Sequence, residues 1–412
     1  MSATKTEDQK DHLQPEISIG MIGHVDHGKS TLVYALTGKF PDTHSEEIKR
    51  GITIRLGYAD SVFVKTKDGY STEIQAKKEN KKYEVLRKVS FVDAPGHETL
   101  MATMLSGAAI MDAALLLISA NEPCPQPQTR EHLMALELIG IKDIIIVQNK
   151  IDLVDKEEIM KSHKQIKDFV NGTIAENAPI IPVSAQHNIN IDYLIEAIQE
   201  SFKTPKRDLE ENPIMLIARS FDINRPGAVP ESLVGGILGG ILKQGKLKQG
   251  QEIEIAPGIK LEEKSDYKPI KTKIVTIMSG SEQFNEITPG GSLGILTELD
   301  PAIVKSDNLA GNLAGLPGKL PNIYQRIKLK PRLIERVVGV KEEVDVVPIA
   351  QGELLMINVN SAVTLGQVTD TSKHIISLTL RLPVVASKND RFAISRRVGA
   401  RWHLIGVGEL VE

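Results

Sequence analysis

Cysteine and aromatic residues are scarce in this chain of 412 residues, which has one cysteine, Cys124, and only 4% aromatic side chains. A single cysteine excludes an intrachain disulfide and any zinc site built from four cysteines, and it fits a reducing cytoplasmic compartment. No apolar run reaches the roughly 18 residues that a membrane-spanning helix needs. Residues 1–15 are polar and lack the apolar core of a signal peptide, so we expect them to form a disordered tail.

A strong excess of either charge is also missing, because 50 basic residues nearly balance 53 acidic ones and leave a formal net charge of −3. The chain therefore lacks the overall basic character of many nucleic-acid-binding proteins, and any RNA contact must come from a local patch. What is present is the composition of an ordinary globular protein, with 41% hydrophobic and 25% charged residues. The length predicts two or three domains.

Short apolar runs alternate with segments of helical periodicity from residue 16 to about residue 207. Runs such as "ISIGMIG" (17–23), "VSFVD" (89–93) and "IIIVQN" (144–149) indicate buried strands. Their alternation with helical segments predicts an α/β domain over residues 16–207, with a mostly parallel sheet covered by helices on both faces. Ligands of such sheets bind beyond the carboxyl ends of the strands.

The pattern changes after residue 207. Closely spaced β-branched runs, separated by turns rich in glycine and proline, indicate sandwiches or barrels. The length of this part favours two β domains, which we place at residues 208–321 and 322–412. Within the first domain, the lysine-rich segment 65–88 contains an Asp68-Gly69 pair that predicts a hairpin turn. This segment is either a solvated excursion or a binding patch.

The stretch "GMIGHVDHGKST" has the glycine, lysine and serine spacing of a phosphate-binding P-loop, between an apolar strand and a helical segment. Backbone N–H groups of the loop and the helix N-terminus would surround the phosphates. Lys29 would reach the β and γ phosphates, and Ser30 would place its hydroxyl on Mg²⁺. The nucleotide contacts predicted in this stretch are Gly23, Asp26, His27, Gly28, Lys29, Ser30 and Thr31.

Two further segments supply residues for the metal and the γ-phosphate. In "FVDAPGHE", a strand ends at Asp93, which can hold Mg²⁺ through a water, and the Gly96 N–H can meet the γ-phosphate. In "KRGITI", the hydroxyl of Thr53 can complete the magnesium coordination when a γ-phosphate is present. Taken alone, "DAPG" is equally compatible with an ordinary turn.

The choice of base is predicted from "QNKID" and "VSAQ". The carboxylate of Asp152 can accept hydrogen bonds from guanine N1–H and its 2-amino group, whereas adenine offers neither in that arrangement. Asn149 would reach the N7/O6 edge of the purine, and the stem of Lys150 would lie over the ring. A backbone N–H near Ala185 would support guanine O6. The residues predicted on the base side are Asn149, Lys150, Asp152, Ser184, Ala185 and Gln186.

Taken together, these motifs resemble those of translational GTPases, the class that includes elongation factor Tu. The resemblance rests on "GHVDHGKS", "RGIT", "DAPGHE", "NKID", "SAQ" and the glycine-punctuated "GGILKQGKLKQGQEIEI". Narrower stretches, such as "KRGITIRLGYAD" and "SRRVGARWHLIGVGEL", are similar to the gamma subunit of archaeal and eukaryotic translation initiation factor 2. The resemblance covers nearly the whole chain beyond the tail. It implies a P-loop GTPase domain followed by two β-barrel domains.

The same resemblance implies a function and a set of partners. It implies a GTP-dependent carrier that brings initiator methionyl-tRNA to the small ribosomal subunit and hydrolyses GTP to GDP to release the tRNA. An alpha and a beta subunit are implied as partners in a heterotrimer. Many archaeal relatives carry a four-cysteine zinc knuckle between the two switches, where residues 65–88 lie, but this segment has no cysteine and no zinc is predicted.

Two residues carry mechanistic hypotheses with open alternatives. In the resembling GTPases, a histidine at the position of His97 orients the attacking water, and imidazole can form that hydrogen bond; the alternative is a solvated turn histidine. Asp26 is unexpected beside phosphates, which repel a carboxylate unless a cation lies between them. Asp26 either helps to hold a second cation, completed by the carbonyl of Gly51, or caps the loop by local hydrogen bonds.

Other functions remain open at this point. The chain could carry an elongation-type aminoacyl-tRNA, as a selenocysteine-specific factor does, although such a factor is expected to have an extra C-terminal domain. It could also be the GTPase subunit of a sulfate-activating enzyme. A general P-loop ATPase conflicts with the guanine-selecting carboxylate of Asp152.

Overall fold

The computed structural model describes residues 13–40, 57–94, 105, 110–224, 233–260, 267–334, 345–399 and 401–411. Most of the predicted N-terminal tail lies outside these residues. The chain divides into two units. The first comprises Met1–Pro205, Glu335–Asp345 and Gly399–Leu404, and the second comprises Lys206–Ile334, Val346–Val398 and Ile405–Glu412.

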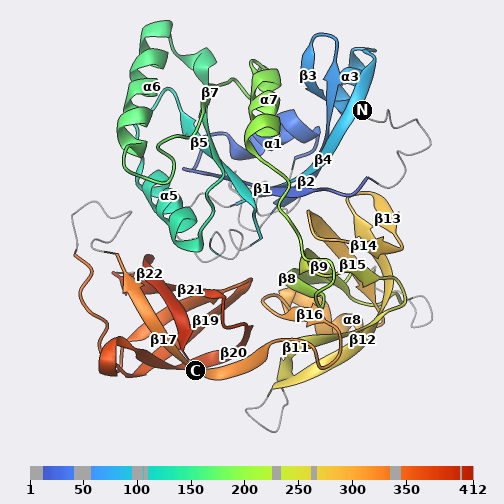
Figure 1. Cartoon of the computed structure of the whole chain (residues 1–412), viewed down its shortest axis with the longest axis vertical. Coiled ribbons are helices and arrows are strands. Elements are labelled where there is room, and N and C mark those ends of the chain that lie inside the picture. Colours follow the sequence, from blue (N-terminus) through green and yellow to red (C-terminus); the bar gives the residue numbers. More distant parts are fainter. Residues whose placement is uncertain are drawn as a thin grey trace. The chain divides into compact units, whose positions relative to one another are not determined.

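A seven-stranded sheet forms the centre of the first unit (Figure 1). In spatial order its strands are β3 (Gly69–Thr72), β2 (Gly57–Thr66), β4 (Tyr83–Asp93), β1 (Ile17–Gly23), β5 (Ala113–Ser119), β6 (Ile144–Asn149) and β7 (Ile180–Pro182). The pairs from β4 to β7 are parallel, whereas β2 runs antiparallel to β3 and β4. The central strands β1, β5 and β6 are buried along their whole length, which explains their continuous apolar sequences. The predicted mostly parallel sheet is confirmed.

Helices cover both faces of this sheet. Helix α1 (Lys29–Thr37) and helix α7 (Ile191–Ser201) pack on one face, where Leu36 and Ile195 join a core with alternate side chains of β1 and β5. Helix α5 (Pro127–Ile139) and helix α6 (Lys156–Val170) lie on the other side (Figure 1). Because the central strands are parallel, the segments that follow β1, β4 and β6 leave the sheet at one edge, where a ligand site is expected.

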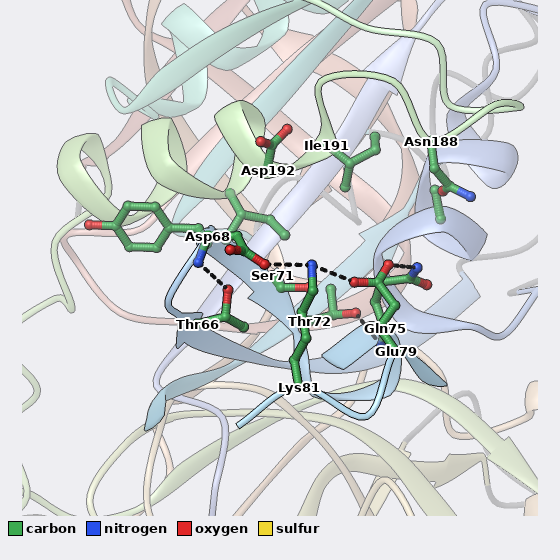
Figure 2. A pocket seen from close by; sticks show the side chains of 13 residues that line it. Thr66, Asp68, Ser71, Thr72, Gln75, Glu79, Lys81, Asn188, Ile191 and Asp192 are labelled. Carbon is green, nitrogen blue, oxygen red and sulfur yellow. Dashed lines mark hydrogen bonds and ion pairs between the residues drawn. The ribbon is translucent and has the colours of Figure 1, made fainter. Parts of the chain in front are cut away.

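The lysine-rich segment 65–88 forms the predicted hairpin and, in addition, a short helix. Thr66 of β2 pairs with Gly69 of β3, and helix α3 (Glu73–Lys78) follows β3 directly. The ammonium group of Lys81 lies 3.0 Å from the carboxylate of Asp68 and 2.7 Å from that of Glu79 (Figure 2). Lys81 thus joins the hairpin turn to the end of α3. Side chains of this segment and of the first turns of α7 line a cavity of about 230 Å³.

Two six-stranded barrels follow, as the resemblance implies. The first closes through pairing of β11 with β12, and its strands are β8 (Ile214–Phe221), β9 (Ile237–Gln244), β11 (Glu252–Lys260), β12 (Tyr267–Ser279), β15 (Ser292–Thr297) and β16 (Leu313–Gly315). Three short strands accompany it: β10 (Leu247–Lys248), β13 (Glu282–Phe284) and β14 (Glu286–Ile287). The second barrel consists of β17 (Asn322–Leu333), β18 (Leu354–Val359), β19 (Ala362–Asp370), β20 (Ile376–Ala386), β21 (Arg391–Val398) and β22 (Arg401–Val411).

Helical structure is sparse in the barrels. Over the described residues of this part, the longest helix is α8 (Pro301–Val304). No helix within the described residues of the whole chain is both long and apolar enough to cross a membrane.

Candidate functional site

The loop between β1 and α1 follows a path that requires glycine at two positions. Gly23 has a φ of 143°, and a Cβ atom there would lie 2.4 Å from the carbonyl oxygen of Leu117. Gly28 has a φ of 89°, and a Cβ atom there would lie 2.4 Å from the side-chain nitrogen of Asn149. Neither conformation is accessible to a residue with a side chain without strain. The loop leads into the N-terminus of α1, where backbone N–H groups can bind an anion.

Lys29 is folded back into this loop. Its ammonium group donates hydrogen bonds to the carbonyl oxygens of Gly23, at 3.1 Å, and His24, at 2.8 Å. The residue is buried, with 7% of its surface exposed. A positive charge is therefore held inside the loop that was predicted to surround the phosphates, and the predicted contact of Lys29 with the β and γ phosphates fits this placement.

Ser30 and Asp93 meet at the edge of the sheet. The Ser30 hydroxyl donates a hydrogen bond of 2.6 Å to the carboxylate of Asp93, which is fully buried at the end of β4. Both are oxygen ligands of the kind that Mg²⁺ prefers, so these residues fit the predicted metal. Within the described part of the chain, no group of three or more His, Cys, Asp or Glu side chains is arranged to hold a metal ion. A magnesium ion here would take its other ligands from phosphate oxygens, water and the predicted Thr53, which lies outside the described residues.

Asn149 joins three segments of the site. Its side-chain nitrogen donates to the carbonyl oxygen of His27 in the P-loop, at 2.9 Å. Its side-chain oxygen accepts the backbone N–H of Ala185, at 3.1 Å. Asn149 is 2% exposed, so these bonds are shielded from water. The amide that was expected at the purine edge therefore also connects the base-side segments to the phosphate loop.

The remaining base-side residues lie close to this connection. Lys150 has a left-handed backbone, with a φ of 62°, and precedes a short 3₁₀ helix at Ile151–Leu153. The carboxylate of Asp152 lies 3.6 Å from Nε2 of His187. Ser184 is buried and Gln186 is exposed. Asp152 thus lies in the short helix just after β6, and its guanine contact remains a prediction.

Two histidines of the phosphate loop, His24 and His27, lie near a third, His132 of α5. The Nδ1 atom of His27 lies 2.9 Å from the carbonyl oxygen of Leu117, and its Nε2 atom lies 3.4 Å from the carboxylate of Glu122. Nδ1 of His132, on α5, accepts the backbone N–H of Gly23 at 3.2 Å. Burial lowers the pKa of His27 and of His24, and it lowers the pKa of His132 to about 3. The ring of His132 is therefore neutral at physiological pH.

His132 and Glu122 were not identified from the sequence. Both lie more than 90 residues from the P-loop in the chain, and only the fold brings them to it. The available signal was a polar residue on the inner face of α5, where its neighbours Leu133 and Leu136 are buried. Such a position demands a hydrogen-bond partner.

Several predicted residues lie outside the described residues: Gly51, Thr53, Gly96 and His97. Asp26 is described; it is exposed and has a φ of 62°. Its proposed role at a second cation stays a prediction. Cys124 is partly buried, and burial raises the pKa of its thiol to about 12, so the thiol remains protonated at neutral pH.

Comparison with protein families assigns the class of protein. Residues 14–204 match the family model of the elongation factor Tu GTP binding domain, and residues 325–410 match that of initiation factor eIF2 gamma, C terminal. The first match runs from β1 to α7 and includes every segment of the site described above. The chain is therefore a guanine-nucleotide-binding GTPase of the translational class.

Curated relatives narrow the class to one family. The chain is 56% identical over 402 residues to translation initiation factor 2 subunit gamma of Methanothermobacter thermautotrophicus, covering 96% of this chain and 98% of that protein. It is 55% identical over 406 residues to the protein of the same name from Methanocaldococcus jannaschii, covering 98% and 99%. The chain belongs to the family of translation initiation factor 2 gamma subunits.

Solved structures agree with the fold. A bacterial selenocysteine-specific elongation factor aligns with a TM-score of 0.74 at 22% identity, over 96% of this chain, and the chain spans 58% of its length. Translation elongation factor SelB of Methanococcus maripaludis, bound to the GTP analogue GppNHp, aligns with a TM-score of 0.71 at 23% identity, over 97% of this chain and 79% of its own. At this level of identity the likeness describes architecture.

Proposed function

We propose that the chain is a GTP-dependent carrier that delivers initiator methionyl-tRNA to the small ribosomal subunit and releases it after GTP hydrolysis. The observation that carries this proposal is the similarity to gamma subunits of translation initiation factor 2 over almost the full length of both chains. The P-loop geometry supports the nucleotide part of the proposal. We place the protein in the cytoplasm, as the gamma subunit of a heterotrimer with an alpha and a beta subunit.

Bound Mg²⁺ would neutralise charge on the β and γ phosphates. Of the chain's own residues, Lys29 binds these phosphates, while Ser30, Thr53 and, through a water, Asp93 hold the metal. Asp152 selects guanine. The nucleotide is also fixed by three groups of residues. These are the loop over Gly23–Thr31, the Gly96 N–H, and the base-side set of Asn149, Lys150, Ser184, Ala185 and Gln186. Asp26 with the Gly51 carbonyl is proposed to hold a second cation.

His97 is proposed to orient the water that attacks the γ-phosphate. Orientation of the nucleophile and electrostatic stabilisation account for most of the catalysis in phosphoryl transfer. We expect His97→Ala to keep its affinity for GTP and to lower the single-turnover rate of hydrolysis by roughly 100-fold or more, within the range of a positioned acid–base group. Equal single-turnover rates for the variant and the parent would contradict this role.

The carrier function is tested by filter binding with three ligands: initiator methionyl-tRNA, elongator methionyl-tRNA and selenocysteinyl-tRNA. Each is measured with GTP and with GDP, on the chain alone and with its alpha subunit. We expect retention of the initiator tRNA in the presence of GTP and weaker retention with GDP. Preference for selenocysteinyl-tRNA would support the elongation-type alternative. Absence of binding to any tRNA, in a protein that still binds GTP, would reject the carrier function.

A further inference from the structure

Both backbone polar groups of one residue, Gly23, are held by side chains from different parts of the first unit. The N–H of Gly23 donates to Nδ1 of His132 at 3.2 Å, and its carbonyl oxygen accepts from the ammonium group of Lys29 at 3.1 Å. Gly23 is the last residue of β1, where the chain leaves the sheet to form the phosphate loop. A steric contact confines it further, because a Cβ atom there would collide with the backbone of Leu117.

We propose that His132 is a positioning residue for the phosphates of the nucleotide, which acts through Gly23 and Lys29 without touching the nucleotide. The imidazole fixes the N–H side of Gly23 and so the position of that residue. The next peptide, which begins at the same Gly23, supplies one of the two carbonyl oxygens that hold the Lys29 ammonium group. This inference concerns the nucleotide site alone and does not depend on the tRNA-carrying function.

The chemistry of the contact requires a neutral ring in one tautomer. Because the Gly23 N–H is the donor, Nδ1 must carry a lone pair and the ring proton must lie on Nε2. His132 is 2% exposed, so no water can replace it as the acceptor without a change in structure. A buried N–H that loses its acceptor is costly, and the loop would be expected to move in order to satisfy it. The positive charge of Lys29 nearby also disfavours protonation of the ring.

Helix α5 is rigid enough to serve as the support. It has 13 residues, from Pro127 to Ile139, with proline in its first turn and Gly140 in the left-handed conformation at its end. Both features fix the helix ends. Leu133, beside His132 on the same helix, is 3% exposed and helps to anchor it in the core. The position of the imidazole is therefore set by the core and not by the loop that it contacts.

The test compares three variants of the full chain by equilibrium and stopped-flow binding of fluorescent GDP and GTP analogues. His132→Leu removes the acceptor and should raise the Kd for both nucleotides by roughly ten-fold or more, mainly through faster release. His132→Asn places its side-chain oxygen near the position of Nδ1 and should restore most of the affinity. Leu136→Ala, one turn along α5, creates a cavity in the same helix but removes no acceptor, and should change the Kd by less than about two-fold.

Circular dichroism and thermal unfolding of each variant show whether it is folded. The proposal is overturned if folded His132→Leu binds GDP within two-fold of the parent. It is also overturned if Leu136→Ala weakens binding as much as His132→Leu, or if His132→Asn fails to recover affinity while it is as stable as the parent. If His132→Leu fails to fold, the proposal is tested by comparing the nucleotide affinities of His132→Asn and His132→Gln. Gln displaces the acceptor by one bond and should bind nucleotide more weakly than Asn.

Discussion

At the scale of single residues, the nucleotide site is organised by side chains that bind backbone groups of other loops. Asn149 connects the phosphate loop to the segment at Ala185, and His132 holds the strand end at Gly23. Each of these side chains is at most 2% exposed, and buried polar groups that are fully satisfied fix a single local arrangement. The residues predicted to touch the nucleotide therefore depend on a supporting layer for their positions.

Asp152 offers a direct test of base selection. An amide in its place can still accept the N1–H of guanine but places an N–H group against the 2-amino group, so Asp152→Asn should lower GTP affinity by roughly 100-fold. The same variant should gain affinity for xanthosine triphosphate, whose C2 carbonyl can accept that N–H. Competition binding with GTP, xanthosine triphosphate and ATP measures both effects.

The matched control for Asp152 is Asp155→Asn, three residues further on. The side chain of Asp155 accepts the N–H of Glu158 at 2.9 Å and caps α6. Asparagine preserves that cap, so this variant should bind all three nucleotides as the parent does. A Kd for GTP that is unchanged in Asp152→Asn would remove the assignment of Asp152 as the guanine selector.

Burial of His132 should also make the free energy of unfolding depend on pH. Its pKa is about 3 in the folded protein, below the ordinary 6.5, so protons bind the unfolded chain more readily. Stability from this group is fully present above pH 6.5 and declines as the pH falls toward 3, by up to about 1.4 kcal/mol per pH unit. Urea unfolding of the parent and of His132→Asn between pH 7.5 and 4.5 should give a stability difference that is constant above pH 6.5. Below pH 6.5 the parent should lose stability relative to the variant. If the stabilities of the two proteins stay parallel down to pH 4.5, the ring of His132 is not buried in its neutral form.

At the scale of elements, the lysine-rich segment 65–88 is held by backbone pairing, a helix cap and ion pairs. The hairpin of β2 and β3 supplies one edge of the sheet. Helix α3 is capped by Thr72, whose side chain accepts the N–H of Gln75 at 3.2 Å. Lys81 then joins Asp68 of the hairpin turn to Glu79 after α3 (Figure 2). Its hydrogen bond with Glu79, and then that with Asp68, raises the pKa of Lys81, while Lys81 lowers the pKa of Glu79.

Because these charged groups are exposed, Lys81 should affect local order more than global stability. We expect Lys81→Met to speed amide hydrogen exchange in α3 and to leave the unfolding midpoint of the chain unchanged. The effect should be smaller in 1 M salt, where screening acts within about 3 Å. Lys82→Met, at the neighbouring exposed lysine, is the control and should leave exchange in α3 as it is. Identical exchange in the two variants would show that Lys81 does not hold this segment.

The elements differ in how far the sequence could predict them. Strand β1 and the P-loop could be predicted from the sequence, because a continuous apolar run and the positions of Gly23 and Gly28 are local signals. Helix α3 was missed, although Thr72 and Gln75 have the spacing of a capping box, because the lysines around it suggested a solvated excursion. The contact of His132 with Gly23 spans 109 residues, and no local pattern encodes such a distance.

At the scale of the whole molecule, each of the two units has a hydrophobic core of its own. The first core gathers side chains from Ile17 to Phe202, and the barrel that follows has a separate core from Met215 to Ala314. Within the second unit, the two barrels meet at a polar cluster. Lys243 of β9 donates to the carboxylate of Asp390 at 2.8 Å. That carboxylate also accepts from the side chain of Asn360, at 2.9 Å, and from the N–H of Ser387, at 2.8 Å.

This cluster should make a measurable contribution to the stability of the second unit. The side chain of Asp390 is 8% exposed, so removing a cation from it costs more than breaking a surface pair, although two other donors remain to hold the carboxylate. We expect Lys243→Met to lower the free energy of unfolding by about 1 kcal/mol. Lys246 pairs with Glu210 at 3.6 Å, and the side chain of Glu210 is 92% exposed. Lys246→Met should therefore change the free energy of unfolding by less than about 0.3 kcal/mol.

Urea unfolding of the two variants and the parent at low and high salt distinguishes the contributions. The deficit of Lys243→Met should persist in 0.5 M salt, because Asp390 is shielded from solvent, whereas any effect of Lys246→Met should vanish. The GTP affinity of both variants should equal that of the parent, since neither lysine belongs to the nucleotide site. Equal stability of Lys243→Met and Lys246→Met would mean that the polar cluster does not hold the barrels together. Apolar contacts, such as the close approach of Gly311 to Ala362, would then hold them.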